Sequence, residues 1–387
     1  MKIAVIGSGI AGLGAAWALS ANNAVSLLEA ADRIGGHSRT LEVDTPDGTI
    51  PVDTGFIVYN ERNYPHLTRL FSELGVPTAE SDMSLSVSTE DGLLEYAGRA
   101  SAMFSRPGAL TDRRLWRVLA GINRFRSEVG SLHRGEVPDN VTISDYLASR
   151  GYSPSFRDLY LMPLAAAVWS GSRQDVALMP ARTFLEFVDN HGLIDLKHRP
   201  QWRTVAGGSR EYVERVAKEI TSVHTGRGVV SVDRVGDGVR VADVAGVEEV
   251  FDHVVIASHG DTALEMLGAD ATPTEREILG SFQYQPNEVV LHTDASVMPR
   301  SRRTWSSWNV MERTNDDGSR PVAVTYWMNR LQNLPTGTDV FVTLNPDGRV
   351  DREKILNTWN AMHPQVDVDT RKAQLDMPTI QGADRIW

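Results

Sequence analysis

Three glycines and one acidic residue near the start of the chain have the types and spacing of a phosphate-binding turn. Gly7, Gly9 and Gly12 directly follow a short apolar run, and Glu29 closes the next apolar run. In such a pattern the first glycine permits a tight turn, the second lets the backbone approach a pyrophosphate, and the third lets a helix pack on a strand. The free N–H groups of that helix would face the phosphates, and Glu29 would accept from a ribose hydroxyl. The pattern therefore predicts a bound dinucleotide that contains ADP.

A second pair of glycines, Gly35 and Gly36, lies in the segment 33–40 and distinguishes between dinucleotides. A nicotinamide-dependent dehydrogenase has no need of this pair, whereas a two-domain flavoprotein needs it where the chain passes close to an extended FAD. Arg39 either pairs with a pyrophosphate oxygen through charge-assisted hydrogen bonds or lies at the surface. His37 is expected either to pack beside the cofactor or to contact it directly. The second pair favours FAD over NAD.

These motifs together resemble those of the flavin amine oxidase and phytoene desaturase superfamily. That superfamily carries the GxGxxG turn, a glutamate and then an Arg-x-Gly-Gly motif, which corresponds to residues 33–36 here. The resemblance continues more weakly in 52–56 and returns in 204–208 and in the apolar run 252–257. The middle of the chain looks like a bacterial branch of amine-oxidase-like proteins, often described only as predicted NAD/FAD-binding. The stretches that carry this second likeness are Trp169-Ser170, Asn190-His191-Gly192 and Trp327-Met328-Asn329.

The resemblance implies FAD as the cofactor and adds three positions to its site. Gly55 and Phe56 would lie near the flavin ring, and Val230 would bind the adenine edge through its backbone. No catalytic residue is assigned, and no spacing of His, Asp and Glu resembles a metal site. The residues expected to bind the cofactor are Gly7, Ser8, Gly9, Ala11, Gly12, Glu29, Ala30, Arg33, Gly35, Gly36, His37, Arg39, Gly55, Phe56 and Val230.

Two features depart from the pattern of the superfamily. Amine oxidases usually have arginine directly after the double glycine, where this chain has His37, and Arg39 follows two positions later. The superfamily also completes its flavin site with a C-terminal glycine-rich strand and helix. The final residues 384–387 look like the start of that last strand. We therefore expect the sequence to be C-terminally truncated.

The apolar runs predict an α/β protein. Because 387 residues are too many for one small core, we expect two interleaved domains. We expect a Rossmann-like FAD-binding domain with an inserted α+β substrate domain, a layout that the resemblance also implies. The expected segments are 1–80 (the first segment of the FAD-binding domain), 81–203 (the helical segment of the substrate domain), 204–265 (the second segment of the FAD-binding domain), 266–370 (the sheet segment of the substrate domain) and 371–387 (the start of the last FAD-domain segment). Helices are expected over 113–132, 156–167 and 209–220, and a strand over 250–257.

The composition excludes several classes of protein. The 39 Lys and Arg against 50 Asp and Glu give a net charge of −11, which argues against a nucleic-acid binder. There is no cysteine, so disulfides and thiolate metal sites are excluded. No apolar run is long enough for a transmembrane helix, although peripheral contact with lipid stays open. These features are compatible with a cytoplasmic enzyme, which is the expected location; the sequence does not indicate an oligomeric state.

Tryptophans and histidines in the later part of the chain are the remaining candidates for substrate contact. Five tryptophans could line an apolar substrate tunnel or belong to an ordinary core. His191 is either a catalytic base or a loop histidine that bonds its own backbone. His259, which follows a strand, is a candidate for a place near FAD. The five tryptophans are Trp169, Trp202, Trp305, Trp308 and Trp327.

Three functions fit these observations. The favoured one is an FAD-dependent oxidoreductase of the amine oxidase and desaturase type, which oxidises or desaturates a small apolar substrate, lipid or isoprenoid-like, by hydride transfer to FAD. The second is a true amine oxidase that releases peroxide. The third is a non-catalytic flavin-binding partner of a lipid-modifying enzyme.

Overall fold

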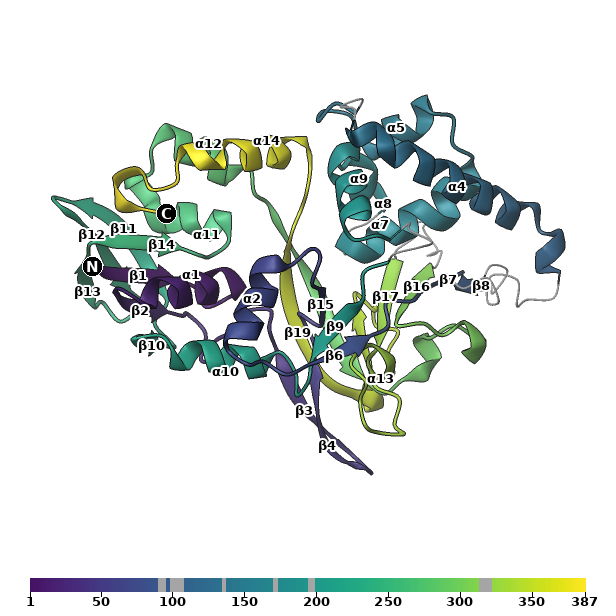
Figure 1. Ribbon diagram of the computed structural model, residues 1–387, viewed down its shortest axis with the longest axis horizontal. Coiled ribbons are helices and arrows are strands. Elements are labelled where there is room, and N and C mark those ends of the chain that lie inside the picture. The colour runs from purple at the N-terminus through teal and green to yellow at the C-terminus, as the bar shows by residue number, and fades with distance from the viewer. Residues whose placement is uncertain (90–94, 98–107, 134–136, 170–172, 194–198, 313–321) are drawn as a thin grey trace.

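The computed structural model describes most of the chain, and Figure 1 shows it as a ribbon. The described residues are 1–89, 95–97, 108–133, 137–169, 173–193, 199–312 and 322–387. Ser170, which belongs to one of the motifs above, lies outside them. Among the described residues, no helix is both long and apolar enough to cross a membrane.

A four-stranded parallel sheet carries the glycine turn. Its strand order is β10-β2-β1-β14, and every pairing is parallel. Helix α1 (Ile10–Ser20) follows β1 and packs on this sheet through Leu13 and Ala16, which are fully buried. The strand bounds are Lys2–Ile6 for β1, Ala24–Leu28 for β2, Ser222–His224 for β10 and His253–Ile256 for β14.

The C-terminal residues extend this sheet by one position. Ile386 forms a parallel bridge with Val254, and the backbone N–H of Trp387 donates to Val254 O at 2.9 Å. Residues 386–387 therefore lie along β14, in the place expected for a last strand of this sheet. Ile386 is buried, whereas Trp387 is half-exposed.

The expected strand over 250–257 is wrong as a single element. The structure divides it into β13 (Glu248–Phe251) and β14, which belong to different sheets. Asp252 makes the break: its N–H donates to Lys2 O at 2.8 Å, and its carboxylate accepts from the Lys2 N–H at 2.7 Å. These two bonds turn the chain from an antiparallel meander into the parallel sheet, a change that an apolar run cannot reveal.

Hairpins and helices surround the parallel sheet. β11 (Val229–Val235), β12 (Gly238–Asp243) and β13 form an antiparallel meander, and the β11–β12 turn is Gly236-Asp237. Two smaller sheets pair β3 with β4 and give the order β5-β9-β6. The bounds are β3 Thr40–Thr45, β4 Gly48–Asp53, β5 Val58–Asn60, β6 Thr78–Ser81, β9 Trp202–Val205, α2 Pro65–Glu73, α10 Arg210–Lys218, α11 Gly260–Leu267, α12 Pro273–Gly280 and α14 Val368–Asp376.

A second, seven-stranded sheet has the order β19-β15-β18-β17-β16-β7-β8. All its pairings are antiparallel except the parallel pair β16–β7. Figure 1 shows the long strands β15 and β19 running between the parallel sheet and the rest of the molecule. The bounds are β7 Leu85–Thr89, β8 Glu95–Ala97, β15 Tyr284–His292, β16 Trp308–Glu312, β17 Val322–Trp327, β18 Phe341–Leu344 and β19 Ile355–Pro364, with the short helix α13 (Met328–Leu331) after β17.

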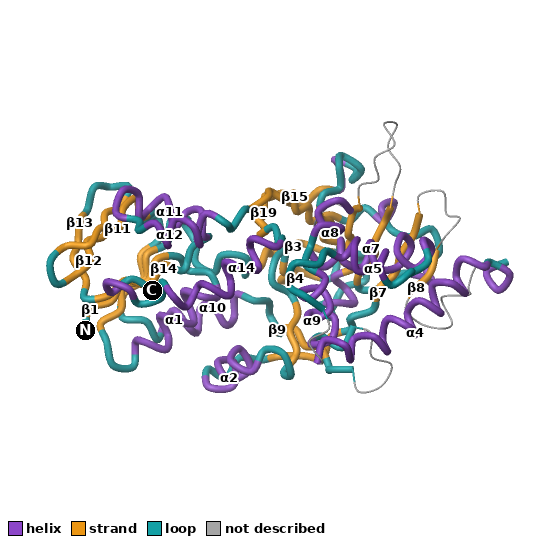
Figure 2. The backbone as a smooth tube through the Cα atoms, turned by 90° about the horizontal axis from the view of Figure 1, so that it is seen from above, coloured by secondary structure: helices purple, strands orange, loops and turns teal. Residues whose placement is uncertain are grey.

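A group of helices packs beside this second sheet at the far end of the molecule (Figure 2). Its core contains Phe125, Phe156 and Phe184, each at most 1 % exposed. The expected helices over 113–132, 156–167 and 209–220 correspond to α4, to α6 and α7 joined by a π-helical turn, and to α10. The helix bounds are α4 Arg113–His133, α5 Ile143–Ser149, α6 Pro154–Phe156, α7 Met162–Trp169, α8 Arg173–Leu178 and α9 Ala181–Asn190.

Candidate functional site

The first glycine turn has the backbone geometry that a phosphate-binding turn requires. Gly7 has a φ of 97°, a conformation that favours glycine, and its N–H donates to Leu28 O at 2.8 Å. A Cβ on Gly12 would lie 1.8 Å from Gly7 O, so any side chain there would push α1 away from β1. A Cβ on Gly9 would meet no atom within 4 Å, and Gly9 caps α1 without a side-chain hydrogen bond. Open space therefore lies before the first N–H groups of α1, which have no partner within the helix.

Glu29 holds the first turn and the end of β2 together. One carboxylate oxygen accepts from the N–H and from the hydroxyl of Ser8, and the other accepts from the Ala31 N–H at 2.8 Å. A carboxylate has about four acceptor positions, so Glu29 keeps capacity for a ribose hydroxyl. Glu29 is half-buried, which leaves it accessible from outside the turn.

The second glycine pair packs against the first turn. Gly35 and Gly36 have φ values of 111° and 57°, and a Cβ on Gly36 would lie 3.0 Å from the Cα of Gly9. The Gly35 N–H donates to the Ser8 hydroxyl at 3.1 Å. Arg33 ties this loop to itself, because its guanidinium donates to Gly36 O at 2.7 Å. The two glycine motifs thus form one continuous surface of closely packed backbone.

Val230 lies at the same end of the parallel sheet as Glu29. The Arg227 N–H donates to Glu29 O at 2.8 Å, and a Cβ on Gly228 would touch the Cβ of Ala30 at 3.4 Å. Val230 follows two residues later and is 52 % exposed. The segment that leads into Val230 therefore lies next to Glu29 and Ala30, beside the predicted ribose site. Ala11 is exposed on the first turn of α1.

Two extended segments bring Gly55 and Phe56 next to His37. The Phe56 N–H donates to His37 O at 2.9 Å, and the Thr54 N–H donates to Arg39 O at 2.8 Å. A Cβ on Gly55 would lie 2.0 Å from His37 O, so only glycine allows this approach. The pairing places these residues together although 18 positions separate His37 from Gly55.

Arg39 reaches away from the first turn, toward β19. Its guanidinium lies 5.1 Å from the ring centroid of Trp359 and donates to Asn357 Oδ1 at 3.4 Å. Burial lowers the pKa of Arg39, with a smaller contribution from Arg33. Arg39 is thus partly buried against an aromatic ring, and its Nε is a buried donor without a partner.

Asp53 is a buried structural acid behind this wall. It accepts from the Thr40 hydroxyl at 2.6 Å, the Ser209 N–H at 2.9 Å and the Gln332 side-chain amide at 3.1 Å. Burial raises its pKa to about 6, even though these hydrogen bonds favour the charged form. Asp53 therefore joins β4, the start of α10 and the segment after α13, and these bonds hold the start of segment 53–56 in place.

A cavity of about 690 Å³ opens beside Gly55 and Phe56. Apolar and aromatic side chains dominate its wall, and none of its described lining residues is Asp, Glu, Lys or Arg. It lies between the pairing of segments 37–39 and 54–56, strands β15 and β19, and the helices α7 and α9. Its lining includes His37, Thr54, Gly55, Phe56, Ile57, Tyr64, Met83, Leu164, Trp169, Phe187, His191, Trp202, His259, Tyr284, Trp308, Tyr326, Trp359, Met362 and His363.

Four described histidines line the cavity, and three of them, from separate segments, are His37, His259 and His363. The rings of His37 and His363 lie 5.7 Å apart, and His259 stacks on Tyr284 at 4.1 Å. Burial, with smaller contributions from His363, His259 and Arg33, lowers the pKa of His37 to about 4. Burial followed by His259 also lowers the pKa of His363. His37 and His363 are therefore neutral imidazoles at pH 7.

His191 lies in an aromatic cluster of the same cavity. Its ring stacks on Phe187 at 3.9 Å, and its Nδ1 is 2.9 Å from Phe187 O. The Tyr64 hydroxyl lies 3.5 Å from His191 Nε2, and the Trp202 ring stacks at 5.9 Å. Burial lowers the pKa of His191. Its bond to its own helix is the local backbone contact that the loop interpretation expected.

The five tryptophans separate into two groups. Trp169, Trp202 and Trp308 line the cavity. Trp305 and Trp327 pack edge to face at 5.4 Å in a different cluster and are not among its lining residues. The interpretation as ordinary core therefore holds for these last two.

The lining residues that no sequence motif indicated include Trp359, His363, Tyr64 and Tyr284. The sequence carries no signal for the first two, because apolar and polar residues do not alternate over 355–364. Along β19 the side chains at 355, 357, 359, 361 and 363 are less exposed than those between them. This alternation appears only in the folded strand, where it gives β19 one covered face, and Trp359 and His363 both lie on that face.

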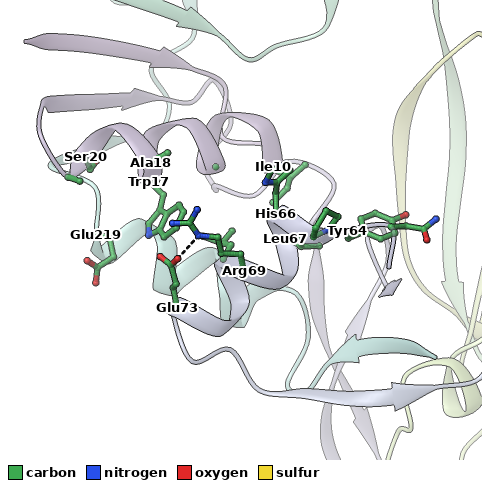
Figure 3. Close-up of a pocket in the computed structure, with 15 residues that line it drawn as sticks. Ile10, Trp17, Ala18, Ser20, Tyr64, His66, Leu67, Arg69, Glu73 and Glu219 are labelled. Carbon is green, nitrogen blue, oxygen red and sulfur yellow. Dashed lines mark hydrogen bonds and ion pairs between the residues drawn. The ribbon is translucent and has the colours of Figure 1, made fainter. Parts of the chain in front are cut away.

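A second pocket of about 880 Å³ lies between α1 and α2 (Figure 3). Trp17 of α1 and Leu67 of α2 line it, together with the ion pair between Arg69 and Glu73, whose Nε–Oε1 distance is 2.6 Å. Tyr64, just before α2, lines both pockets. The inner cavity is the stronger candidate site, because it adjoins Gly55 and the histidines.

The residues present fit an extended dinucleotide such as FAD. The fit rests on the open space at Gly9, the free N–H groups at the start of α1, the remaining acceptor capacity of Glu29 and the buried Nε2 of His37, which has no partner. The glycine turns lie at the carboxyl ends of β1 and β2, where parallel sheets of this type bind ligands.

Comparison with known proteins agrees with this geometry. A profile of the family "Flavin containing amine oxidoreductase" matches residues 10–356. The chain belongs to this family. Members of the flavin containing amine oxidoreductase family are FAD-dependent oxidoreductases.

The chain is similar to the flavin-containing amine oxidase of Oncorhynchus mykiss, one of its curated relatives. It is 28 % identical over 287 residues, which cover 68 % of this chain and 51 % of the relative. The chain thus spans about half the length of the curated relative that it matches.

Solved structures of other oxidoreductases and of an isomerase share the fold. A CLA-producing fatty acid isomerase from P. acnes has a TM-score of 0.67 at 17 % identity, and putrescine oxidase bound to putrescine has 0.70 at 13 %; each match covers 100 % of this chain and 92 % of the other. Cyclohexylamine oxidase from Brevibacterium oxydans IH-35A has 0.64 at 18 %, with 99 % of this chain and 79 % of the other covered. At these identities the likeness establishes the α/β fold.

Proposed function

We propose that the chain is an FAD-dependent oxidoreductase that oxidises or desaturates an apolar substrate of the lipid or isoprenoid type. The observation that carries the proposal is the cavity of about 690 Å³ beside Gly55 and Phe56, whose described lining has no charged carboxylate, ammonium or guanidinium group. Removing an apolar chain from water into such a cavity is favourable, whereas an ammonium group would lose its hydration without gaining a carboxylate partner.

The chain's own residues would hold the cofactor along one line. The N–H groups at the start of α1 would bind the pyrophosphate, and Glu29 would accept from the ribose. His37, Gly55 and Phe56 would then form the wall next to the flavin ring. When bound, FAD supplies a two-electron acceptor for a hydride.

The apolar wall would orient the substrate and exclude water from the reacting carbon atoms. Trp308 and Tyr326 are in edge-to-face contact, with ring centroids 4.8 Å apart at 83°, and form a rigid section of this wall. The fold is also compatible with such a substrate, since one structural neighbour is named as a fatty acid isomerase.

A true amine oxidase is the second candidate, and the same aromatic pair favours it. Aromatic faces such as those of Trp308 and Tyr326 can also enclose a neutral amine next to a flavin. Putrescine oxidase and cyclohexylamine oxidase share the fold, which is compatible with amine chemistry on this scaffold. The missing carboxylate in the described lining argues against a diamine, because its second ammonium group would stay unpaired.

Anaerobic mixing distinguishes the candidates. Protein loaded with FAD is mixed with oleate (used throughout as its uncharged methyl ester), with geranylgeraniol or with benzylamine, and flavin absorbance is followed over time. Bleaching by oleate or geranylgeraniol, with none by benzylamine, supports the proposal. Fast bleaching by benzylamine alone would favour the amine oxidase, and a protein that binds FAD but is bleached by none of many probes would be a non-catalytic partner.

A further inference from the structure

We propose that His363 is the base that accepts the substrate proton during desaturation, with the imidazole of His259 as its neighbouring acceptor. The inference deepens the proposed function and rests on it. It starts from a requirement of the chemistry, because a desaturation removes two hydrogens and only one of them can leave as a hydride.

The balance of the step shows why a base is needed. One C–H bond breaks with its electron pair leaving as hydride to FAD, which is reduced by two electrons. The adjacent C–H bond gives up a proton to the free imidazole nitrogen of His363, and its electron pair forms the new C=C bond. The substrate is oxidised, and the proton then passes from the imidazolium to water.

The composition of the cavity restricts which residue can be this base. The described lining has no Asp, Glu or Lys, and its ionisable side chains are His37, His191, His259, His363 and tyrosines. Burial raises the pKa of the lining tyrosines Tyr64, Tyr284 and Tyr326, which stay protonated at pH 7. Among the described lining residues, only the histidines can accept a proton.

The hydrogen bonds of the four histidines separate them further. His191 is committed to Phe187 O and to the Tyr64 hydroxyl. His37 has its Nε2 fully buried, and its pKa of about 4 makes it a weak acceptor. In the described part of the chain, the half-exposed rings of His259 and His363 have no hydrogen-bond partner. These two are the accessible free bases.

The position of His363 favours it over His259. It lies on β19 on the same strand face as Trp359 and Ala361, which also line the cavity. Pairing with β15 places it opposite Gln285, within a register of nine residue pairs that holds the strand in place. The His259 ring is instead stacked on Tyr284 at 4.1 Å, which covers one of its faces.

The surroundings of His363 keep it neutral. The titratable groups next to it are His37, whose ring lies 5.7 Å away, and His259 at the start of α11, which is itself stacked on Tyr284 of β15. Burial and then His259 lower the pKa of His363, so it is deprotonated above pH 6.5. A neutral imidazole at physiological pH is the form that can accept a proton.

The first test uses FAD-free protein and does not depend on turnover. Diethyl pyrocarbonate modifies neutral, accessible imidazoles, and mass spectrometry locates the adducts. We expect adducts on His363 and His259 that decrease several-fold when oleate is present. His66, exposed on α2, should react equally with and without oleate and serves as the internal control. An unreactive His363, or one that oleate does not protect, would contradict the proposal.

The second test measures the rate of flavin bleaching in the FAD-loaded protein. We expect His363→Asn to slow bleaching by oleate or geranylgeraniol about 10²–10⁴-fold, the usual contribution of a general base, with FAD affinity unchanged. The wild-type rate should rise with pH to a plateau above pH 6.5, and this rise should disappear in the variant. Added imidazole should restore some of the rate, and His66→Asn should behave as wild type.

The outcomes separate this proposal from the proposed function. If wild-type protein is bleached by the apolar probe but His363→Asn keeps both the rate and the pH profile, the role of His363 is wrong and the function stands. If His363→Asn loses FAD affinity instead, the residue supports the cofactor site and is not the base. If no apolar probe bleaches the wild type, the proposed function fails, and the role of His363 fails with it.

Discussion

Replacing Gly9 by alanine should separate cofactor binding from folding. Gly9 has φ −62° and ψ 179°, which alanine adopts without strain, and the added methyl group would meet no protein atom within 4 Å. The methyl group would extend into the open space before α1, where the pyrophosphate is predicted to lie. Folding should therefore be little affected by the change, whereas FAD binding should be weakened.

The expected magnitudes follow from this geometry. Alanine is a poorer N-cap than glycine, and it also lowers the entropy of the unfolded chain; these terms oppose each other, so the free energy of unfolding should change by less than about 1 kcal/mol. Displacing the pyrophosphate loses at least one charge-assisted hydrogen bond, worth roughly 1.5–3 kcal/mol. That loss corresponds to a dissociation constant for FAD about ten- to a hundred-fold higher.

The assay is a titration of FAD into apo-protein, with thermal unfolding of the same samples. Gly14→Ala is the matched control, because Gly14 lies in the same helix and a Cβ there also meets no atom within 4 Å. It should bind FAD as the wild type does and be up to about 1 kcal/mol more stable, since alanine is the better helix former. An FAD affinity of Gly9→Ala within two-fold of the Gly14→Ala value would refute the predicted pyrophosphate site.

Three further predictions concern single residues. Glu29→Ala should raise the dissociation constant for FAD about ten- to a hundred-fold in a calorimetric titration, because a charge-assisted acceptor worth roughly 1.5–3 kcal/mol is lost; unchanged affinity would place the ribose elsewhere. Gly55→Ala should lower the melting temperature and FAD affinity together, because its Cβ would lie 2.0 Å from His37 O; a variant as stable as wild type would contradict that close approach. His292 has its pKa lowered to about 4 by burial, and its Nδ1 accepts from the Asp294 N–H at 3.0 Å. Because this pKa is lowered in the folded state, neutral His292 stabilises the fold above pH 6.5, and this stabilisation is lost as the pH falls toward 4. The melting temperature measured at pH 7.5, 5.5 and 4.5 should therefore decline, and it should decline less in His292→Asn. Equal declines in the two proteins would contradict this cause.

The sequence alone was sufficient where the physical constraint is local. A tight turn into a helix needs glycine within a few residues, so Gly7 and Gly12 could be recognised from their spacing, and both have the close contacts that the pattern implies. The strand-turn-helix order and the long helix over 113–132 follow in the same way from apolar periodicity. The family and its FAD cofactor followed from these local motifs, whereas the individual binding residues and the domain boundaries stay predictions.

Elements whose identity depends on distant partners were harder to predict. The run 250–257 is largely apolar, yet Asp252 divides it between two sheets by bonding Lys2, which lies 250 positions earlier. β19 has several polar residues, and it becomes a ten-residue strand because it pairs with β15. Neither outcome is encoded in the properties of a short window of sequence.

The composition of the cavity was decided by the tertiary structure. His37, His259 and His363 come from a loop, a helix start and a strand end, and no spacing in the sequence indicates that they lie together. They meet because the parallel sheet, the 37–39 to 54–56 pairing and the β15–β19 register bring three distant segments to one wall. The sequence determined a dinucleotide turn from local backbone sterics, whereas the apolar cavity and its free imidazoles depend on long-range packing, which residue spacing does not specify.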